Sequence, residues 1–548
     1  MSSTRTPAVT LAHLSFHWPD GSTVLHELSA SFTAGRTGLI GSNGTGKTTL
    51  LRLIAGNLAP TSGSVTVTGE VGRLPQHLIL ETGSTVADLL GVAARLAAMR
   101  AIESGDADPA HFETLAEDWD VEARSLAALD RIGLPGIGLP GIGLDRRVGT
   151  LSGGETVLAA LTGLQLAGHE VVLLDEPTNN LDRDSRRLMY EAIASWRGTL
   201  IVVSHDVELL NLMDTTAELR DGTLALFGGP YDDYQDHLAD QQAAAQQALR
   251  SAEQQLRTEQ RQRVEAQTTL ARRRCYARTD YQNKRRPKMI MNNRRQEAQV
   301  SAGKLRGRLD ASVEAARRAV AQQEERIRRD PTITIALPDP DVPSGRRLAE
   351  LRDRHGHRII LQGPEHLALT GRNGVGKTRL LNTLMSPEGA PWQGMRAEGL
   401  TDRIGYLPQR LDHLDDGATA LETVRAAAPG APEGDLRAGL ARFLFRGEAV
   451  DRRVGDLSGG ERFRVALAAL LLADPPNQLL VLDEPTNNLD LHSVDELVDA
   501  LAGYRGGLIV VSHDSHVLDR LGIDTWVTMD ESGLHETSPS PPGAGDGP

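Results

Sequence analysis

The sequence is poor in cysteine and has no long hydrophobic run. Its single cysteine among 548 residues, Cys275, excludes an internal disulfide framework and favours a reducing compartment. The longest apolar stretch, Val465–Leu482, is interrupted by Asp474-Pro475-Pro476, so it falls short of the roughly 18 uninterrupted residues of a membrane span. The first residues lack the charged and apolar regions of a signal peptide. These absences predict a cytoplasmic protein without a membrane-spanning segment.

Lysine is also rare, because only five of the 59 basic residues are lysines. Three of the five lie in one basic segment, and Lys47 and Lys377 lie in two glycine-rich loops. In a chain that otherwise uses arginine, lysine in these loops indicates a site that a planar guanidinium would not fit.

The chain is too long for one hydrophobic core, and its 40% hydrophobic and 24% charged residues are typical of a globular protein with several domains. We predict a first domain at 1–230 and a second at 331–536, joined by a helical linker at 231–330. The Pro-, Gly- and Ser-rich tail, 537–548, is predicted to be disordered.

The first glycine-rich loop, Gly41–Thr48, reads GSNGTGKT and lies between a short apolar strand and a helix. Glycines let successive backbone N–H groups surround a phosphate, the lysine reaches the β- and γ-phosphate oxygens, and the threonine faces Mg²⁺. The nucleotide-contacting residues predicted here are Gly41, Asn43, Gly44, Gly46, Lys47, Thr48 and Thr49.

Polar residues recur downstream at the ends of short strands and at the start of a helix. The motif LSGGE opens a helix with hydroxyl and backbone donors suited to phosphate, in Ser152, Gly153 and Gly154. Asp175 ends a continuous apolar strand and can hold Mg²⁺ through water, while Glu176 can polarise an attacking water. His205 ends the next apolar strand and is predicted to be catalytic with Glu176. The predicted metal ligands of this set are Thr48, Gln76 and Asp175, and Gln76 is also a predicted nucleotide contact.

The same series of motifs occurs a second time, in the same order, after the linker. The offset between the copies is 330 residues at the glycine-rich loop and 306 to 308 at the later motifs, which indicates a domain duplication. The second nucleotide-contacting set is Gly371, Asn373, Gly374, Gly376, Lys377, Thr378, Gln409, Ser458, Gly459 and Gly460. Its metal ligands are Thr378, Gln409 and Asp483, and its catalytic pair is Glu484 and His513. Alternating strands and helices, with ligands at strand ends, predict the α/β class with a parallel sheet in each copy.

The linker is predicted to form two long antiparallel helices joined by an irregular tip around Pro287. Residues 241–330 contain 22 lysines and arginines against ten acidic residues, although the whole chain has a net charge of −14. The charge peaks at 272–295, where ten basic residues accompany only Asp280, and Tyr276 and Tyr281 can stack on bases. A solvated coiled-coil spacer is the simpler reading, but charge concentrated at the tip favours contact with RNA or DNA.

Together these motifs resemble two ATP-binding cassettes, and their fusion through a charged linker without membrane segments resembles the ABC-F family of translation factors. The resemblance implies two tandem P-loop ABC ATPase domains, 1–230 and 331–536, joined by a long antiparallel α-helical linker, with ATP and Mg²⁺ as cofactors. It implies that the cassettes close head to tail in a monomer with two intramolecular composite sites. One would combine Lys47, Thr48, Gln76, Asp175, Glu176 and His205 with Ser458, Gly459 and Gly460. The other would combine Lys377, Thr378, Gln409, Asp483, Glu484 and His513 with Ser152, Gly153 and Gly154.

The resemblance further implies that the ATP-bound form enters the ribosomal E site. Its linker, through 272–295, would point at rRNA, the P-site tRNA and the peptidyl-transferase centre, and neither a membrane nor DNA is an expected partner. The copies depart unequally from the family pattern. Trp18 stands where an aromatic would stack on adenine, whereas the second copy offers only His355 or His357 there, and the first LSGGE lacks the arginine that follows the second, Arg464. We therefore expect the two sites to be unequal, with the Lys47 site the better bound.

Several functions remain open at this stage. Ribosome protection against an antibiotic is favoured, because the long basic tip with Lys284 and Lys288 could reach the drug-binding region. A general translation factor is the alternative: Gln76 to Leu151 spans 75 positions against 48 from Gln409 to Leu457, where such factors insert an arm. The ATPase subunit of an exporter would leave the basic linker unexplained. A DNA-repair ATPase would need zinc cysteines or longer coiled coils, and a scaffold would not need both glutamates.

Overall fold

The computed structural model describes residues 7–76, 83–134, 143–179, 181–282, 288–327, 338–386, 390–487 and 489–537. The chain divides into two compact units, one formed by Met1–Tyr231 with Thr332–Pro548 and the other by Asp232–Pro331. The predicted disordered tail lies outside the described residues except for Thr537, which ends the last strand.

The first cassette is built on a six-stranded sheet in the order β5-β6-β7-β3-β8-β9. Its strands are β5 (Val71–Leu74), β6 (Val171–Asp175), β7 (Thr199–Val203), β3 (Gly35–Ile40), β8 (Thr215–Arg220) and β9 (Thr223–Phe227). All neighbours are parallel except β8 and β9. The central strands β6 and β7 are buried along their whole length, as expected for a parallel sheet covered on both faces.

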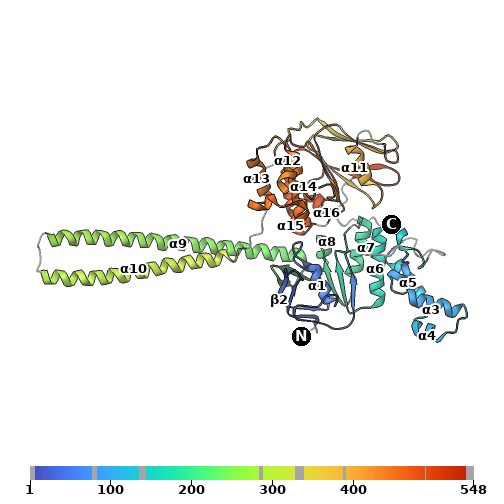
Figure 1. The fold of residues 1–548 in the computed structure, drawn as a ribbon, viewed down its shortest axis with the longest axis horizontal. Helices are drawn as coiled ribbons and strands as arrows, with labels where there is room; N and C mark the ends of the chain where they lie inside the picture. Colours follow the sequence, from blue (N-terminus) through green and yellow to red (C-terminus); the bar gives the residue numbers. More distant parts are fainter. Residues whose placement is uncertain are drawn as a thin grey trace. The chain divides into compact units, whose positions relative to one another are not determined.

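Two layers cover this sheet. On one face an antiparallel sheet of β1 (Pro7–His17), β2 (Thr23–Thr33) and β4 (Ser62–Val67), with helix α1 (Lys47–Ile54), encloses a core of hydrophobic side chains. A second core, on the other face, lies under α6 (Gly153–Ala167), α7 (Arg183–Ala194) and α8 (Val207–Leu210). Figure 1 shows α6 and α7 beside the sheet.

The second cassette repeats this architecture, which confirms the predicted duplication of a parallel α/β domain. Its large sheet has the order β14-β15-β16-β12-β17-β18, and its small sheet has the order β11-β10-β13. The strands are β14 (Ile404–Leu407), β15 (Leu479–Asp483), β16 (Gly507–Val511), β12 (His366–Thr370), β17 (Thr525–Met529), β18 (Leu534–Thr537), β11 (Arg358–Gln362), β10 (Arg347–Arg352) and β13 (Arg396–Gly399). The helices are α11 (Lys377–Met385), α12 (Ala420–Ala427), α13 (Glu433–Arg442), α14 (Gly459–Leu471), α15 (Leu491–Ala502) and α16 (Ser515–Arg520).

Within its described residues, the longer segment between Gln76 and Leu151 forms four α-helices, α2 (Val86–Leu89), α3 (Ala93–Glu103), α4 (Pro109–Leu115) and α5 (Val121–Arg131). The sequence pattern predicts one helix over 86–102, and this prediction is wrong, because the chain turns between α2 and α3 at Gly91, whose φ of 70° is left-handed. Glycine adopts that conformation at little cost. Figure 1 shows α3 and α4 packed as a pair.

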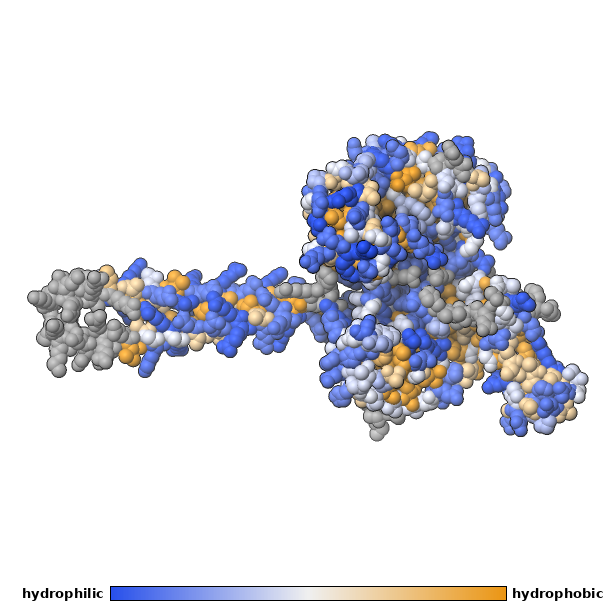
Figure 2. All heavy atoms as spheres, in the orientation of Figure 1, coloured by the Kyte–Doolittle hydropathy of each residue, from blue (hydrophilic) through white to orange (hydrophobic). Residues whose placement is uncertain are grey.

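The linker consists of two long helices, α9 (Tyr231–Gln282) and α10 (Lys288–Glu324), which lie side by side and antiparallel in Figure 1. Nε of Arg263 on α9 lies 2.8 Å from Oδ1 of Asp310 on α10, and Val313 of α10 is buried. The visible face is mainly hydrophilic (Figure 2), and Cys275 is exposed on α9. The predicted tip at 283–287 and the side chains of 277–299 lie outside the described part. Among the helices of the described ranges, none is long and apolar enough to cross a membrane.

Candidate nucleotide-binding sites

The two P-loops place glycines where a side chain would collide with backbone. A Cβ on Gly41 would lie 2.4 Å from the carbonyl oxygen of Leu219, and one on Gly371 would lie 2.2 Å from that of Met529. Gly46 and Gly376, with φ of 100° and 109°, form the N-caps of α1 and α11 without a side-chain cap. The first N–H groups of both helices are therefore left for an anion, and the helix dipole favours negative charge there.

Each P-loop lysine is buried and curls back over its own loop. Nζ of Lys47 donates to the carbonyl oxygens of Gly41 at 2.5 Å and Ser42 at 3.1 Å. Nζ of Lys377 makes the same pair of bonds, at 2.6 and 3.2 Å, to residues 371 and 372. Burial lowers the pKa of both ammonium groups. Each loop thus holds a positive charge at the position where a phosphate would be bound.

Both predicted catalytic glutamates have a strained backbone. Glu176 follows β6 with φ of 50°, and Glu484 follows β15 with φ of 49°. Such left-handed conformations cost non-glycine residues about 1–3 kcal/mol and persist where the surroundings fix them. Here the N–H of each glutamate donates over 2.8 Å to the end of the neighbouring strand, at Val203 and Val511.

The aspartates before them are almost wholly buried and face the P-loop threonines. Oγ1 of Thr48 donates to Oδ1 of Asp175 at 3.2 Å, and burial raises the pKa of Asp175 and of Asp483. Within the described residues, Oδ2 of Asp175 and Oδ1 of Asp483 accept no hydrogen bond. An unsatisfied, buried carboxylate oxygen beside a threonine hydroxyl fits a hydrated divalent cation. The described residues contain no cluster of three or more His, Cys, Asp or Glu that could hold a metal, so such a cation would also need ligands from the nucleotide.

The neighbours of the two aspartates differ. In the first cassette Nη2 of Arg73, on the adjacent strand β5, lies 3.6 Å from Oδ2 of Asp175. In the second, Tyr406 takes the matching place on β14, and its hydroxyl donates to Oδ2 of Asp483 at 3.5 Å. The first site therefore carries an additional positive charge next to its predicted metal ligand.

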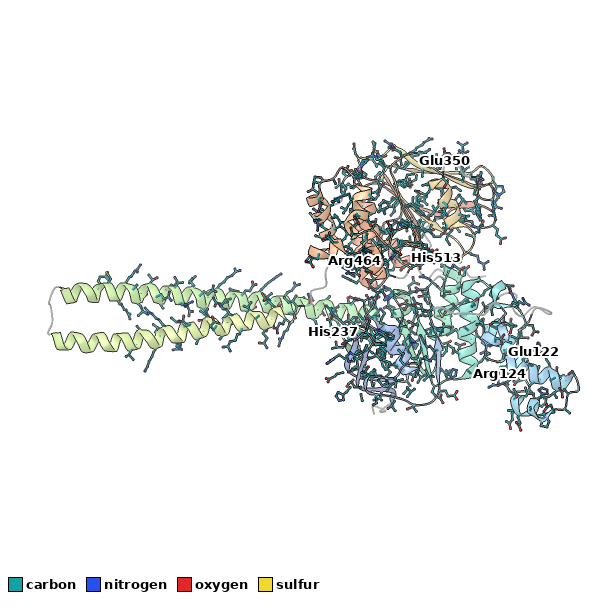
Figure 3. The ribbon with its side chains drawn as sticks, in the orientation of Figure 1. Glu122, Arg124, His237, Glu350, Arg464 and His513 are labelled. Carbon is teal, nitrogen blue, oxygen red and sulfur yellow. The ribbon has the colours of Figure 1, made fainter. Side chains whose placement is uncertain are left out.

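Each glutamate faces the predicted histidine of its own cassette. Nε2 of His205 lies 3.0 Å from Oε1 of Glu176, and Nε2 of His513 (Figure 3) lies 3.3 Å from Oε1 of Glu484. Burial raises the pKa of Glu176 to about 8 and that of Glu484 to about 7. Burial also lowers the pKa of each histidine to about 3, which keeps the imidazoles neutral. In the second cassette the imidazole also lies 3.0 Å from Nζ of Lys377.

The two LSGGE serines cap the helices they precede. Oγ of Ser152 accepts from the N–H of Glu155 at 3.2 Å, and Ser458 is capped in the same way with Glu461. These capping boxes fix the start of α6 and α14 and orient the glycines that follow each serine, Gly153–Gly154 and Gly459–Gly460.

The predicted glutamines are exposed at the ends of β5 and β14. Gln409 lines a cavity of about 340 Å³ together with Glu484 and Gly459. The structure therefore brings together, in one cavity of the second cassette, three residues that span 75 positions of the sequence.

The two cassettes are also connected by hydrogen bonds that the sequence did not predict. The N–H of Asn43, in the first P-loop, donates to Oδ2 of Asp490 at 2.7 Å, and the N–H of Asn373 donates to Oδ2 of Asp182 at 3.3 Å. Each aspartate ends the LDEPTNNLD motif of the opposite cassette. The sequence signal that could have pointed to these aspartates is their identical position in both copies of the motif.

Two features bear on the prediction that the Lys47 site binds nucleotide better than the Lys377 site. Trp392, which sequence reasoning missed, lies against the P-loop glycine Gly376 of the second cassette. Arg464 (Figure 3) reaches the buried Glu496 at 3.9 Å inside its own cassette, so its absence from the first copy is a difference in the core.

Trp18 lies at the β1–β2 turn with its ring edge-on to Phe16 at 5.0 Å. The predicted contact Thr49 is buried in α1.

Comparison with known proteins gives consistent matches. A sequence profile of the family described as ABC transporter matches residues 25–179 and 357–487. The tylosin resistance ATP-binding protein TlrC of Streptomyces fradiae is 34% identical over 539 residues, covering 91% of this chain and 94% of that protein. ATP-binding cassette sub-family F member 3 of Rattus norvegicus is 29% identical over 504 residues, covering 90% of this chain and 67% of that protein. A solved structure described as a model of ribosome-bound archaeal Pelota and ABCE1 matches 94% of this chain and 76% of its own, with a TM-score of 0.51 and 18% identity, a likeness of fold.

Proposed function

The chain belongs to the ABC-F family of ATP-binding cassette proteins, and from this premise we propose that it hydrolyses ATP at two composite sites and binds the ribosome in its ATP-bound state. The observation that carries the hydrolytic part is the repeated arrangement of a buried P-loop lysine, a strand-end aspartate and a glutamate facing a neutral histidine.

The proposed reaction follows from these positions. Lys47 and Lys377 exchange their carbonyl partners for phosphate oxygens when a nucleotide binds, and the helix N-termini of α1 and α11 bind the same phosphates. Glu176 or Glu484, once deprotonated, accepts a proton from a water molecule while the oxygen of that water attacks the γ-phosphorus. The bond from the γ-phosphorus to the bridging oxygen breaks, giving ADP and phosphate. Its histidine partner holds the glutamate in place. Mg²⁺, when bound beside Thr48 and Asp175 or Thr378 and Asp483, supplies charge neutralisation of the phosphates.

The composite arrangement is part of the proposal. The bonds Asn43–Asp490 and Asn373–Asp182 support a pairing in which each P-loop faces the opposite cassette. Ser458 would then complete the Lys47 site and Ser152 the Lys377 site. One chain would form both sites and act as a monomer in the cytoplasm.

The ribosomal part of the proposal rests on family membership and on the charge of the linker. The 22 basic residues against ten acidic ones in 241–330 supply the positive surface that phosphate backbones attract. We propose that the cassettes enter the E site and that the linker, through 272–295, contacts rRNA and the P-site tRNA near the peptidyl-transferase centre.

Antibiotic resistance by ribosome protection is the favoured role, because a relative that shares 34% identity over nearly its whole length is named for tylosin resistance. The four helices α2–α5 favour the second candidate, a general translation factor, since they enlarge the first cassette where such factors carry an arm.

Sedimentation with ribosomes tests the proposal. The Glu176→Gln/Glu484→Gln variant, expected to bind ATP without hydrolysing it, should pellet with ribosomes in ATP and stay in the supernatant without nucleotide. Absence of pelleting, with ATP binding verified, would overturn the ribosomal role. Recovery in a membrane complex would then favour the exporter subunit.

A further inference from the structure

Trp392 is held in place by a two-residue turn next to the second P-loop. The backbone N–H of Trp392 donates to the carbonyl oxygen of Met395 at 2.9 Å, and the backbone N–H of Met395 donates to the carbonyl oxygen of Trp392 at 2.8 Å. Gln393 and Gly394 between them have φ of 49° and 81°, as this tight turn requires. Met395 is fully buried in the core below the small sheet. The tryptophan is therefore fixed by backbone geometry and by an anchored neighbour.

The indole lies directly against the phosphate loop. A Cβ built on Gly376 would lie 2.1 to 2.6 Å from Cη2, Cζ3 and Cζ2 of Trp392, so only a glycine permits this contact. The guanidinium carbon of Arg379, on the first turn of α11, lies 6.0 Å from the ring centroid. Trp392 is only partly buried, so part of its ring remains open to a ligand.

The first cassette has different residues at the positions that correspond to this part of the second cassette. Counting from the turn glycines Gly21 and Gly356, whose φ values are 85° and 87°, Trp18 corresponds to Asp353. Oδ1 of Asp353 accepts from the N–H groups of both His355 and His357 at 2.8 Å, so this side chain is committed to shaping its own turn.

The residue in the place of Trp392 in the first cassette is also different. Counting from Gly63 and Gly394, whose φ values are 79° and 81°, it is Thr61, whose hydroxyl accepts from the backbone N–H of His17 at 3.0 Å, next to Trp18. The glycine that corresponds to Gly376 is Gly46, and its neighbour is the aliphatic side chain of Val24. Trp392 therefore lies against the second P-loop, whereas the first cassette carries Trp18 in its β1–β2 turn.

We propose that Trp392 provides the flat apolar surface on which the nucleobase stacks in the second ATP site, in place of the aromatic missing from the β10–β11 turn. This inference rests on the proposed ATP binding. Stacking of one base on an aromatic side chain is worth roughly 1–3 kcal/mol, or about five- to 150-fold in affinity. Arg379 packs against the ring by a cation–π contact and restricts its rotation. The second site therefore recognises the base as well as the phosphates.

The test is photolabelling of the full chain with 8-azido-ATP. Mass spectrometry of the labelled peptides identifies the site, so the 8-azido-ATP concentration that gives half-maximal labelling is measured for each site separately. The parent is the Glu176→Gln/Glu484→Gln variant. Adding Trp392→Leu, which keeps apolar volume but no flat face, should raise the half-saturating concentration of the second site about tenfold. Trp392→Phe should stay within about threefold of the parent, because it keeps an aromatic face. Trp18→Ala is the matched control and should weaken the first site only.

Competition by inorganic tripolyphosphate separates base recognition from damage to the loop. Its affinity for the second site should be the same in the parent and in Trp392→Leu. If Trp392→Leu weakened the binding of tripolyphosphate and of ATP equally, the inference would be overturned, because Trp392 would then only support the structure of the loop. Tighter ATP binding would also overturn it, because the indole would then be blocking the site. A parent that takes up no label at either site would refute the proposed ATPase itself, a result distinct from both.

Discussion

Nε2 of His205 lies 3.0 Å from Oε1 of Glu176, and both side chains are largely buried at the end of the central strands. Burial pushes their pKa values in opposite directions, so the carboxyl keeps a proton and the imidazole stays neutral near pH 7. The predictions about pH follow from this pair and its counterpart in the second cassette.

Glu176→Gln should stabilise the nucleotide-free protein increasingly as the pH rises. The pKa of Glu176 is raised from 4.5 to about 8, so its contribution to folding is fully present below about pH 4.5 and is lost as the pH rises through about 8. Glutamine has no such loss, and its advantage should reach on the order of 5 kcal/mol at pH 9 and be small at pH 5. Urea midpoints at both pH values measure this, with the exposed Glu117→Gln as control. A constant difference between the two variants at all pH values would contradict it.

The two sites should show different pH profiles of ATP hydrolysis. Glu484→Gln leaves Glu176 as the base, with a pKa of about 8, and Glu176→Gln leaves Glu484, with a pKa of about 7. Because a general base acts only when deprotonated, turnover in Glu484→Gln should rise with a midpoint about one pH unit higher. Phosphate release between pH 6 and 9 measures both midpoints, and the double variant gives the background. Coinciding midpoints would show that the sites are equivalent.

Arg73→Tyr should increase the affinity of the first site for Mg²⁺. The guanidinium lies 3.6 Å from Asp175, and tyrosine occupies this place in the second cassette. Removing the positive charge should lower the Mg²⁺ concentration for half-maximal ATP binding roughly fivefold, or ~1 kcal/mol. Equilibrium ATP binding at fixed nucleotide and varied Mg²⁺ is the readout. The reciprocal change, Tyr406→Arg, should weaken the second site; no change in either variant would rule out this role for Arg73.

Replacing Lys284, Arg285, Arg286 and Lys288 by alanine should leave ATP binding intact and weaken ribosome binding. These residues lie where the sequence concentrates positive charge. For every phosphate that the variant no longer binds, the slope of log affinity against log salt should fall by about 0.7 to 0.9. The control removes four arginines elsewhere on the linker, Arg306, Arg308, Arg317 and Arg318, and should weaken binding less. Equal effects of both variants would mean that the tip has no special role.

The sequence was sufficient for those parts of the site that depend on a short stretch of chain. Glycine spacing places Lys47 at a helix N-terminus, and an apolar strand that ends in two carboxylates places Asp175 and Glu176 at a sheet edge. Because the motifs recur, the duplication and the parallel sheet of each copy could be predicted with them.

The parts that sequence reasoning missed depend on contacts between distant segments. Arg73 reaches Asp175 because β5 and β6 are neighbours, although the two residues are about 100 positions apart. Trp392 arrives through a turn whose conformation no helix or strand pattern reveals. The break at Gly91 was missed because the helical pattern continues on both sides of it.

The exposed thiol on α9 gives experimental access to the linker alone. Since Cys275 is the only cysteine in the chain, a maleimide dye or spin probe would attach at one position without any engineering. Its fluorescence anisotropy or line shape would report when the linker becomes immobilised by a large partner, while the cassettes remain unmodified. The protein thus carries a built-in reporter position within its most basic stretch, 272–295.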